Sequence, residues 1–402
     1  MFTRVFILAG SVLPIIAWPL LAQEPSATRP SDDSILWQQT YTLRERPEPV
    51  RLTTLPGGGY RIVGKTSWTK DSAAKLNDRY GFEFFVLDVD RQGRQVALET
   101  FESIPRRREQ VRDAVVVGDG WVVAGETSWL GWIDAKGRLQ REVELRGEPK
   151  VFIHPRCLLP LTQGRFLVGG SPGYKDAWVG EVDADGRVIW EETFDHGADE
   201  AVHAMVARPD GGFVFLATSG KFDKFGQGPS TLWLVSCDAR GRKEHEAVLP
   251  DGRLMPGGHP VLVGTGDGYA LAFSRSGLPG ITNAGGSGPA FTRHIAVFDQ
   301  ELRPQWEKEY PPTGSMWSLL VARPGGELIS IGGASKGLSI SRISAEGEPL
   351  AETRVPLSGI LSWPIDVIAD ADTLTILVKG VLESPDPTGS PSDIVRLVRI
   401  RL

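Results

Sequence analysis

Two histidines of this chain occupy the same position in neighbouring repeats, as residues that contribute to one site would. His203 and His259 each lie ten residues before an aromatic residue that follows a glycine-containing turn. His154 and Arg156 lie near the same level one repeat earlier. Transition-metal sites need three or four converging ligands, and the third position here is out of phase. The pattern therefore predicts hydrogen-bonded histidines, with no metal and no other cofactor.

Other sequence motifs that could indicate metal binding or catalysis are incomplete or absent. The stretch Asp183-x-Asp185-Gly186 resembles the start of a calcium loop, but the further carboxylates at fixed offsets are missing, so we interpret it as a hairpin turn. The sequence has no Gly-x-Ser-x-Gly elbow, no phosphate-binding loop and no vicinal cysteine pair. A glycosidase or lyase needs two facing carboxylates, and the sequence alone does not pair them.

A repeated pattern positions all of these residues. A turn followed by an aromatic residue or a leucine recurs about every 50 residues. The seven anchors are Tyr60, Trp121, Phe166, Phe213, Tyr269, Leu328 and Leu374. Each unit has the pattern of four short strands, and helical periodicity is essentially missing. Seven units of four antiparallel strands predict an all-β fold, a seven-bladed β-propeller.

A turn of the form Asp-x-x-Gly joins the third and fourth strands of most units. It occupies residues 90–93, 134–137, 183–186 and 238–241, and residues 344–347 are a variant that begins with serine. Aspartate at such a turn can accept hydrogen bonds from its own backbone, and glycine adopts positive φ without strain. The turn therefore predicts a short hairpin in each of these blades.

The two ends of the chain predict how the ring closes. Residues 35–41 (ILWQQTY) share their pattern with the fourth-strand residues 188–194 (VIWEETF), and the C-terminal IVRLVRIRL matches a third strand. We therefore expect residues 35–43 to pair with residues 394–402 and to complete the last blade, which removes the exposed edges of an open ring. The tryptophans of such fourth strands, Trp37, Trp190 and Trp306, are then expected to pack between blades.

Several motifs resemble a known group of proteins. The pattern Gly-x-Thr-Ser-Trp occurs at residues 64–68 and 125–129, Asp-Ala-Trp at 176–178, and Asp-x-x-Gly-x-x-x-Trp at 183–190. These motifs resemble those of bacterial secreted propeller-repeat proteins, which are similar to quinoprotein-type repeats. The resemblance covers nearly the whole chain after residue 22. It implies a β-propeller fold and export, but no particular activity.

The predicted loops differ between the two faces of the ring. Nearly all insertions fall between second and third strands, at residues 69–80, 219–230, 274–291 and 379–392, or between blades, at 103–110 and 250–258. Long loops in a compact domain are often functional, so we expect the binding face there. The candidate binding residues are Trp68, Trp129, Tyr174, Phe222, Phe225, Arg275, Trp317 and Trp363, with His203 and His259 near the central channel.

Composition limits the compartment and the partner. Residues 1–22 have the charged start, apolar stretch and small final residue of a secretory signal peptide, which leaves residues 23–402 as one propeller domain. No later segment has the roughly 18 apolar residues that span a bilayer, and a net charge of −6 gives no nucleic-acid footprint. Cys157 and Cys237 are predicted to lie too far apart for a disulfide.

These observations favour a periplasmic or secreted protein without catalytic activity. We expect it to bind an envelope or extracellular protein or peptide through the loop-rich face, and a glycan partner stays open. The alternative is an enzyme, a hydrolase or lyase acting on a glycan or small molecule at the mouth of the central channel. Ionisable groups with shifted pKa values in a deep pocket would favour the enzyme, whereas a broad aromatic surface would favour binding.

Overall fold

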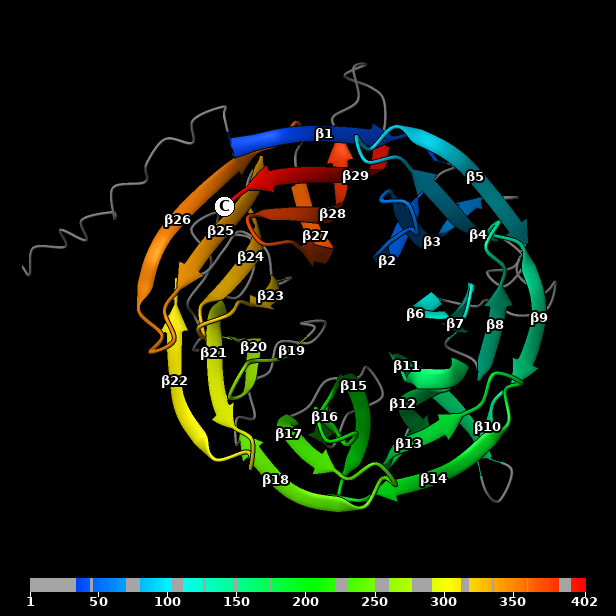
Figure 1. Ribbon diagram of the computed structural model, residues 1–402, viewed down its shortest axis with the longest axis vertical. Helices are drawn as coiled ribbons and strands as arrows, with labels where there is room; N and C mark the ends of the chain where they lie inside the picture. The colour runs from blue at the N-terminus through cyan, green and yellow to red at the C-terminus, as the bar shows by residue number, and fades with distance from the viewer. Residues whose placement is uncertain are drawn as a thin grey trace, which may run out of the picture.

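The protein folds into a ring of seven antiparallel sheets, as the computed structural model shows (Figure 1). The structure describes residues 34–43, 46–69, 80–102, 111–125, 128–147, 151–173, 175–220, 230–249, 260–276, 291–311, 318–334, 336–359, 361–382 and 392–402. Each sheet is one blade of four strands, and one blade carries a fifth strand of two residues. The seven-bladed β-propeller predicted from the sequence is confirmed. No helix that could span a membrane is found within the described part of the chain.

The strands follow one another through the blades in chain order. Blade 1 contains β2 (Pro47–Thr54), β3 (Tyr60–Thr69), β4 (Tyr80–Val89) and β5 (Gln95–Glu102), and blade 2 contains β6 (Val111–Val117), β7 (Gly120–Gly125), β8 (Trp129–Ile133) and β9 (Leu139–Glu144). Blade 3 contains β10 (Arg146–Gly147), β11 (Val151–Pro160), β12 (Phe166–Pro172), β13 (Ala177–Val182) and β14 (Val188–Phe194), with a 3-10 turn at Thr162–Gly164. Blade 4 contains β15 (Asp199–Ala207), β16 (Phe213–Gly220), β17 (Ser230–Cys237) and β18 (Lys243–Leu249).

The remaining three blades complete the ring. Blade 5 contains β19 (Val261–Gly264), β20 (Gly268–Ser276), β21 (Phe291–Asp299) and β22 (Pro304–Tyr310). Blade 6 contains β23 (Ser318–Ala322), β24 (Leu328–Ala334), β25 (Gly337–Ile343) and β26 (Pro349–Pro356). Blade 7 contains β27 (Leu361–Ala369), β28 (Thr373–Leu382), β29 (Ser392–Arg401) and the N-terminal β1 (Ile35–Tyr41).

The first strand of each blade lies nearest the axis of the ring. Each of these strands contacts the first strand of both neighbouring blades, and Figure 1 shows them around the middle of the molecule. They are β2, β6, β11, β15, β19, β23 and β27. Residues far apart in the sequence therefore meet near the axis.

The ring closes between the two ends of the described chain. Strand β1 pairs antiparallel with β29, from Ile35 opposite Ile400 to Tyr41 opposite Val395. The hydroxyl of Tyr41 also donates a 2.7 Å hydrogen bond to the carbonyl of Gly93 in blade 1. The predicted pairing of the N-terminal and C-terminal strands is confirmed, and it leaves β29 paired on both sides.

Apolar side chains pack mainly between neighbouring blades. Phe215 and Trp233 of blade 4 are buried in one cluster with Leu167 and Val179 of blade 3. Middle strands are covered on both faces in this arrangement, so they are apolar along most of their length, as the burial of β16 shows. The repeated apolar strands thus build seven similar interfaces between blades rather than one central core.

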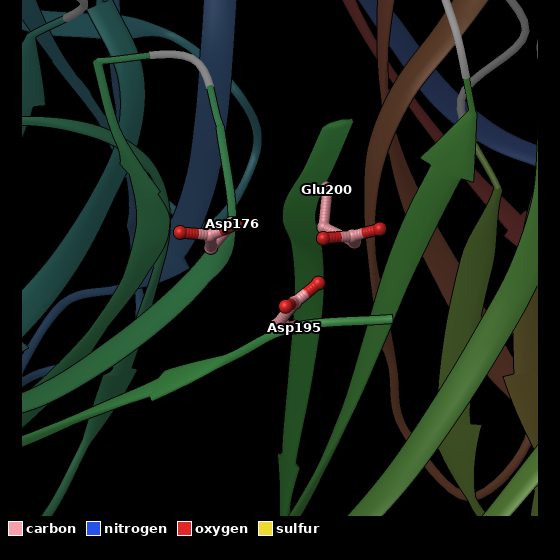
Figure 2. Close-up of side chains that lie close together, drawn as sticks. All are labelled: Asp176, Asp195 and Glu200. Atoms are coloured by element: carbon pink, nitrogen blue, oxygen red, sulfur yellow. The ribbon is translucent and has the colours of Figure 1, made fainter. Parts of the chain in front are cut away.

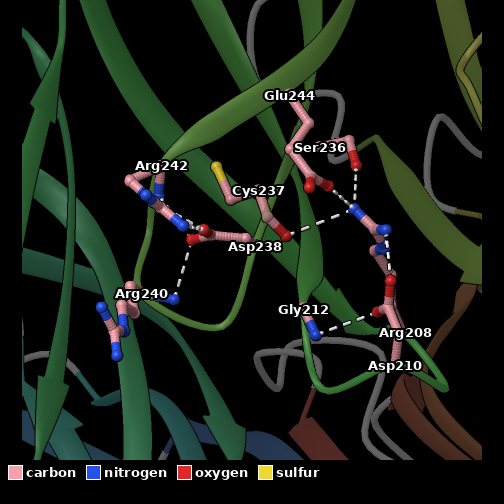
Figure 3. Close-up of polar contacts among 9 residues, drawn as sticks. All are labelled: Arg208, Asp210, Gly212, Ser236, Cys237, Asp238, Arg240, Arg242 and Glu244. Atoms are coloured by element: carbon pink, nitrogen blue, oxygen red, sulfur yellow. Dashed lines mark hydrogen bonds and ion pairs between the residues drawn. The ribbon is translucent and has the colours of Figure 1, made fainter.

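The Asp-x-x-Gly turn has a second role in packing. In the turn after β17, the Oδ1 atom of Asp238 accepts the backbone N–H groups of Arg240 and Arg242, both at 2.9 Å (Figure 3). Gly241 has φ of 81°, and a Cβ atom there would lie 2.5 Å from the ring of Trp190 in the preceding blade. Glycine is required at this position because it permits both the backbone angle and the close approach of the indole.

One turn departs from this pattern for a reason that lies in the preceding blade. Residues 299–302 form the same turn in blade 5, but Leu302 takes the glycine position at φ of 61°. In the preceding blade the exposed His245 stands where β14 has Trp190. Leu302 is buried in a cluster with Leu249 of that blade. Its side chain therefore fills apolar space next to a blade whose fourth strand lacks the tryptophan. The sequence pattern required glycine at this position, so it did not predict this turn.

Both cysteines are free and buried. Cys157 lies on the first strand of blade 3 and Cys237 on the third strand of blade 4, and both belong to one apolar cluster. Burial raises the pKa of Cys237 to about 12. A thiol held in its neutral form is a weak nucleophile, so these residues serve packing.

Candidate functional site

The strand bounds place every long connection on one face of the ring. We call it the loop-rich face; it carries the segments between second and third strands and those between blades. Its longer segments are residues 70–79, 103–110, 221–229, 250–260, 277–290, 311–317 and 383–391. On the opposite face, which we call the hairpin face, every connection between strands lies within the described residues, and none of them exceeds five residues. The asymmetry predicted from the sequence is therefore present in the topology.

Several predicted binding residues lie outside the described residues. These are Tyr174, Phe222, Phe225, His259 and Trp317. Trp68 belongs to β3, opposite Gly81 of β4, but its side chain is likewise outside the description. For these six positions the binding role stays a prediction.

Trp129 lies inside the molecule rather than on a binding surface. Its side chain is 2 % exposed and stacks on Phe84 of blade 1, with ring centroids 5.3 Å apart and planes 7° apart. Val123 and Ile133 belong to the same apolar cluster. The aromatic residue at the start of β8 therefore packs blade 2 against blade 1, and it offers no surface to a partner in this conformation. Trp363, by contrast, is half-buried on β27, opposite Lys379.

Arg275 is held against its own blade. Its guanidinium lies 2.6 Å from Glu307 and 3.2 Å from Nδ1 of His294, and it sits 5.0 Å from the ring centroid of Phe273. Burial, and then the charge of Arg275, lowers the pKa of His294. This polar group at the loop-rich end of blade 5 combines one predicted residue with His294, which sequence reasoning did not single out.

His203 occupies a bulge in the first strand of blade 4. The register of β15 shifts between Val202 and Ala204, which leaves His203 outside the pairing, and its Nε2 lies 2.8 Å from the Oγ1 atom of Thr218. Arg112 of β6 and Arg156 of β11 occupy bulges at the equivalent place. Bulges re-aim side chains, and here they repeat a basic or imidazole group at one level of three successive blades.

Charged side chains near the axis join the blades. Arg51 of β2 donates from Nε to Asp113 of β6 at 2.9 Å, and its Nη1 lies 3.6 Å from Asp366 of β27. Asp113 also accepts the backbone N–H of Leu158 in blade 3, and Asp366 accepts that of Leu52 in blade 1, both at 2.8 Å. Burial raises the pKa of Asp366, while Arg51 opposes the shift. These bonds link blades 7, 1, 2 and 3.

Three carboxylates meet where blades 3 and 4 adjoin on the loop-rich face (Figure 2). Asp176 directly precedes β13, Asp195 directly follows β14, and Glu200 is the second residue of β15. Since Ala177 pairs with Phe194, the register continues to place Asp176 beside Asp195. One oxygen from each of the three side chains lies within 4.8 Å of the others. We call this group the carboxylate cluster.

The hydrogen bonds of the carboxylate cluster leave it without a balancing cation. Glu200 is 1 % exposed, and its Oε1 accepts hydrogen bonds from the N–H of Ala198 at 2.9 Å and the hydroxyl of Ser219 at 2.7 Å. Asp195 accepts the N–H of Gly197 at 2.7 Å. Among the described residues, no lysine or arginine forms an ion pair with any of the three acids. Oxygen ligands of this kind are those that hard cations prefer.

Comparisons with known proteins identify the fold. A comparison with protein-family models and one with curated proteins find no match. Among solved structures, Kuenenia stuttgartiensis hydrazine synthase is 15% identical over 86% of this chain and 98% of that chain, with a TM-score of 0.56. The Dos1 propeller is 8% identical over 92% of this chain and 95% of that chain, with a TM-score of 0.50.

A methanol dehydrogenase is also among the solved structures that match. The europium-containing enzyme is 11% identical over 92% of this chain and 93% of that chain, with a TM-score of 0.46. At such identities the likeness concerns the fold alone. The function of this chain must therefore be argued from its own residues.

Sequence reasoning missed the carboxylate cluster. One signal was available, because an aspartate directly before a third strand and another directly after the fourth strand of the same blade become neighbours once the two strands pair. The approach of Glu200 had no such signal, since it depends on how blade 4 packs against blade 3.

Proposed function

We propose that this protein is an exported β-propeller without catalytic activity, which binds a protein or peptide through its loop-rich face. The observation that carries the proposal is the one-sided distribution of long connections: all seven segments longer than five residues join strands at the loop-rich face. Random tolerance of insertions would spread them over both faces. Binding sites of rigid scaffolds lie preferentially on such loops.

The hairpin face supports the proposal by contrast. Its charged side chains are largely engaged within their own turns. Arg94, Arg138, Arg242 and Arg303 each bond the aspartate four residues earlier, at 2.7 to 3.0 Å. Groups that already have partners gain little from a new one. The regular turns thus indicate that the hairpin face contributes to stability. Recognition is then expected on the loop-rich face.

The residues near the axis argue against the enzyme alternative. A catalytic carboxylate pair needs oxygens that are open to a substrate. Both oxygens of Asp113 and both oxygens of Asp366 accept backbone N–H groups, and Arg51 is bonded to Asp113 as well. This group of bonded charges therefore fits a role in fastening blades.

The binding role is tested with variants on the two faces. The partner is first captured from the envelope or culture fluid, and its affinity for each variant is then measured by calorimetric titration. Phe222→Ala with Phe225→Ala is expected to weaken binding by roughly 2 kcal/mol or more, since a few aromatic anchors dominate most interfaces. Arg187→Ala and Arg242→Ala on the hairpin face are the matched controls and should retain wild-type affinity. The opposite result would contradict the choice of face.

Export is tested separately. The proposed signal peptide, residues 1–22, is fused to a reporter that is active only outside the cytoplasm. Reporter activity together with cleavage near residue 22 is expected. A reporter that stays inactive would contradict export while leaving the binding proposal to its own test.

A further inference from the structure

The carboxylate cluster carries an inference beyond partner binding: we propose that Asp176, Asp195 and Glu200 form a calcium site that fastens blade 3 to blade 4 on the loop-rich face. The three side chains come from separate strand ends (Figure 2), and one oxygen of each lies within 4.8 Å of the others. Two ligand oxygens on opposite sides of one calcium ion are about 4.8 Å apart, because each Ca–O distance is about 2.4 Å. The observed spacing of 4.8 Å or less therefore fits a single ion.

Glu200 gives an independent indication of a ligand. The residue is only 1 % exposed, and its buried Oε2 atom has no hydrogen-bond donor among the described residues. Figure 2 shows one oxygen of Glu200 turned toward Asp195 and the other turned away from it, and Oε1 already accepts the hydroxyl of Ser219. Glu200 therefore brings a buried oxygen without a donor to the carboxylate cluster.

Burial makes this arrangement unfavourable without a counter-charge. A buried carboxylate oxygen without a partner has lost its hydration and gained nothing. The neighbouring aspartates add repulsion between like charges, and no lysine or arginine among the described residues balances them. A cation between the three acids offsets both effects.

The ligand atoms select the kind of cation. All three ligands are carboxylate oxygens, which suit calcium and magnesium rather than zinc or copper. Calcium takes six to eight oxygens in flexible geometry, whereas magnesium demands a near-ideal octahedron with shorter bonds. Asp195 is exposed and Asp176 half-buried, so water can complete the shell from one side. Calcium is therefore the better fit.

The test uses the full chain after removal of metals with a chelator. Calcium chloride is titrated by calorimetry, and the melting temperature is measured with and without the ion. We expect one calcium per chain and a higher melting temperature with calcium, whereas magnesium chloride at equal concentration has a smaller effect. Glu200→Gln keeps the shape of the side chain, removes its charge and should weaken calcium binding roughly tenfold or more.

Two further variants make the result decisive. Asp195→Asn changes an exposed residue and retains an oxygen for the N–H of Gly197, so it serves if Glu200→Gln fails to fold; it should also lose the calcium effect. Asp185→Asn removes an exposed acid from the hairpin face of the same blade and should leave calcium binding unchanged. The proposal is overturned if wild type shows no calcium effect up to about 10⁻³ M, or if Glu200→Gln or Asp195→Asn binds calcium as tightly as wild type.

Discussion

The carboxylates on the two faces of the ring have different partners. On the hairpin face, Asp238 accepts backbone N–H groups and also the guanidinium of Arg242 at 2.7 Å (Figure 3). On the loop-rich face, Asp176, Asp195 and Glu200 lie close together (Figure 2), with one oxygen of each within 4.8 Å of the others. The first arrangement balances charge within a few residues. The second leaves charge for something outside the described chain to balance.

Arg208 is a second example of charge balance on the hairpin face. Its guanidinium donates to the hydroxyl of Ser236 at 2.6 Å, pairs with Asp210 at 2.5 Å and also contacts Glu244. Asp210 belongs to the turn before β16, and Glu244 belongs to strand β18 of the same blade. We infer from this difference that the hairpin face stabilises each blade, whereas the loop-rich face carries unsatisfied groups for recognition.

The largest expected effect comes from opening the ring on which both faces depend. Deletion of the chain through Thr42 removes β1, unpairs one side of β29 and takes Tyr41 from an apolar cluster shared with blade 1. We expect the free energy of unfolding to fall by several kcal/mol, because an open ring exposes edge strands. Denaturant unfolding measures this. A truncated protein as stable as the full chain would contradict the importance of closure.

A smaller effect is expected from the glycine of a hairpin-face turn. Gly241→Ala imposes positive φ on alanine and presses Cβ against Trp190, so we expect a loss of about 3 kcal/mol. Gly325→Ala is the matched control, since Gly325 also has positive φ of 86° but open space around its Cβ position. It should lose only about 1 kcal/mol. Equal losses would show that the contact with the indole is unimportant.

The smallest effects are expected when one acid on each face is neutralised. Both variants are studied at neutral pH in the presence of a chelator. Asp238→Asn loses its ion pair with Arg242 and should lower the melting temperature slightly. Asp195→Asn relieves repulsion in the carboxylate cluster and should leave the melting temperature unchanged or raise it. Thermal unfolding of both variants side by side decides this. A decrease of the same size in both would remove the contrast between the faces.

Acid unfolding sharpens the same comparison. The backbone N–H of Arg242, then that of Arg240 and the Arg242 side chain, hold the pKa of Asp238 below its ordinary value. A group with a lowered pKa in the folded state stabilises the fold above its unfolded-state pKa, and this contribution is lost as the pH falls through the folded-state pKa. Wild type should therefore lose stability below about pH 4 more steeply than Asp238→Asn does.

The fold could be predicted because its determinants are local and repeated. Residues 35–41 and 188–194 share a pattern that marks a fourth strand wherever it occurs, so ring closure followed from the sequence. The turn at residues 299–302 was missed because Leu302 depends on the missing tryptophan of the preceding blade. Such compensation between blades can be seen only once their packing is known.

The candidate site could be predicted much less well. Trp129 was placed on the binding face because it adjoins a loop, but its ring packs on Phe84. The contacts of Arg51 with Asp113 and Asp366 join residues from three blades and have no local signature. Sequence periodicity shows which residues a strand buries, whereas the meeting of side chains from different blades depends on register and twist.

The most direct test of the loop-rich face as the working face is amide hydrogen exchange with and without the captured partner. We expect the partner to slow exchange in peptides that contain residues 221–229 and 277–290. Peptides that contain the hairpin turns 90–94 and 238–242 should exchange at the same rate in both states. Slowed exchange confined to those hairpin turns would contradict the assignment and place the partner on the opposite face.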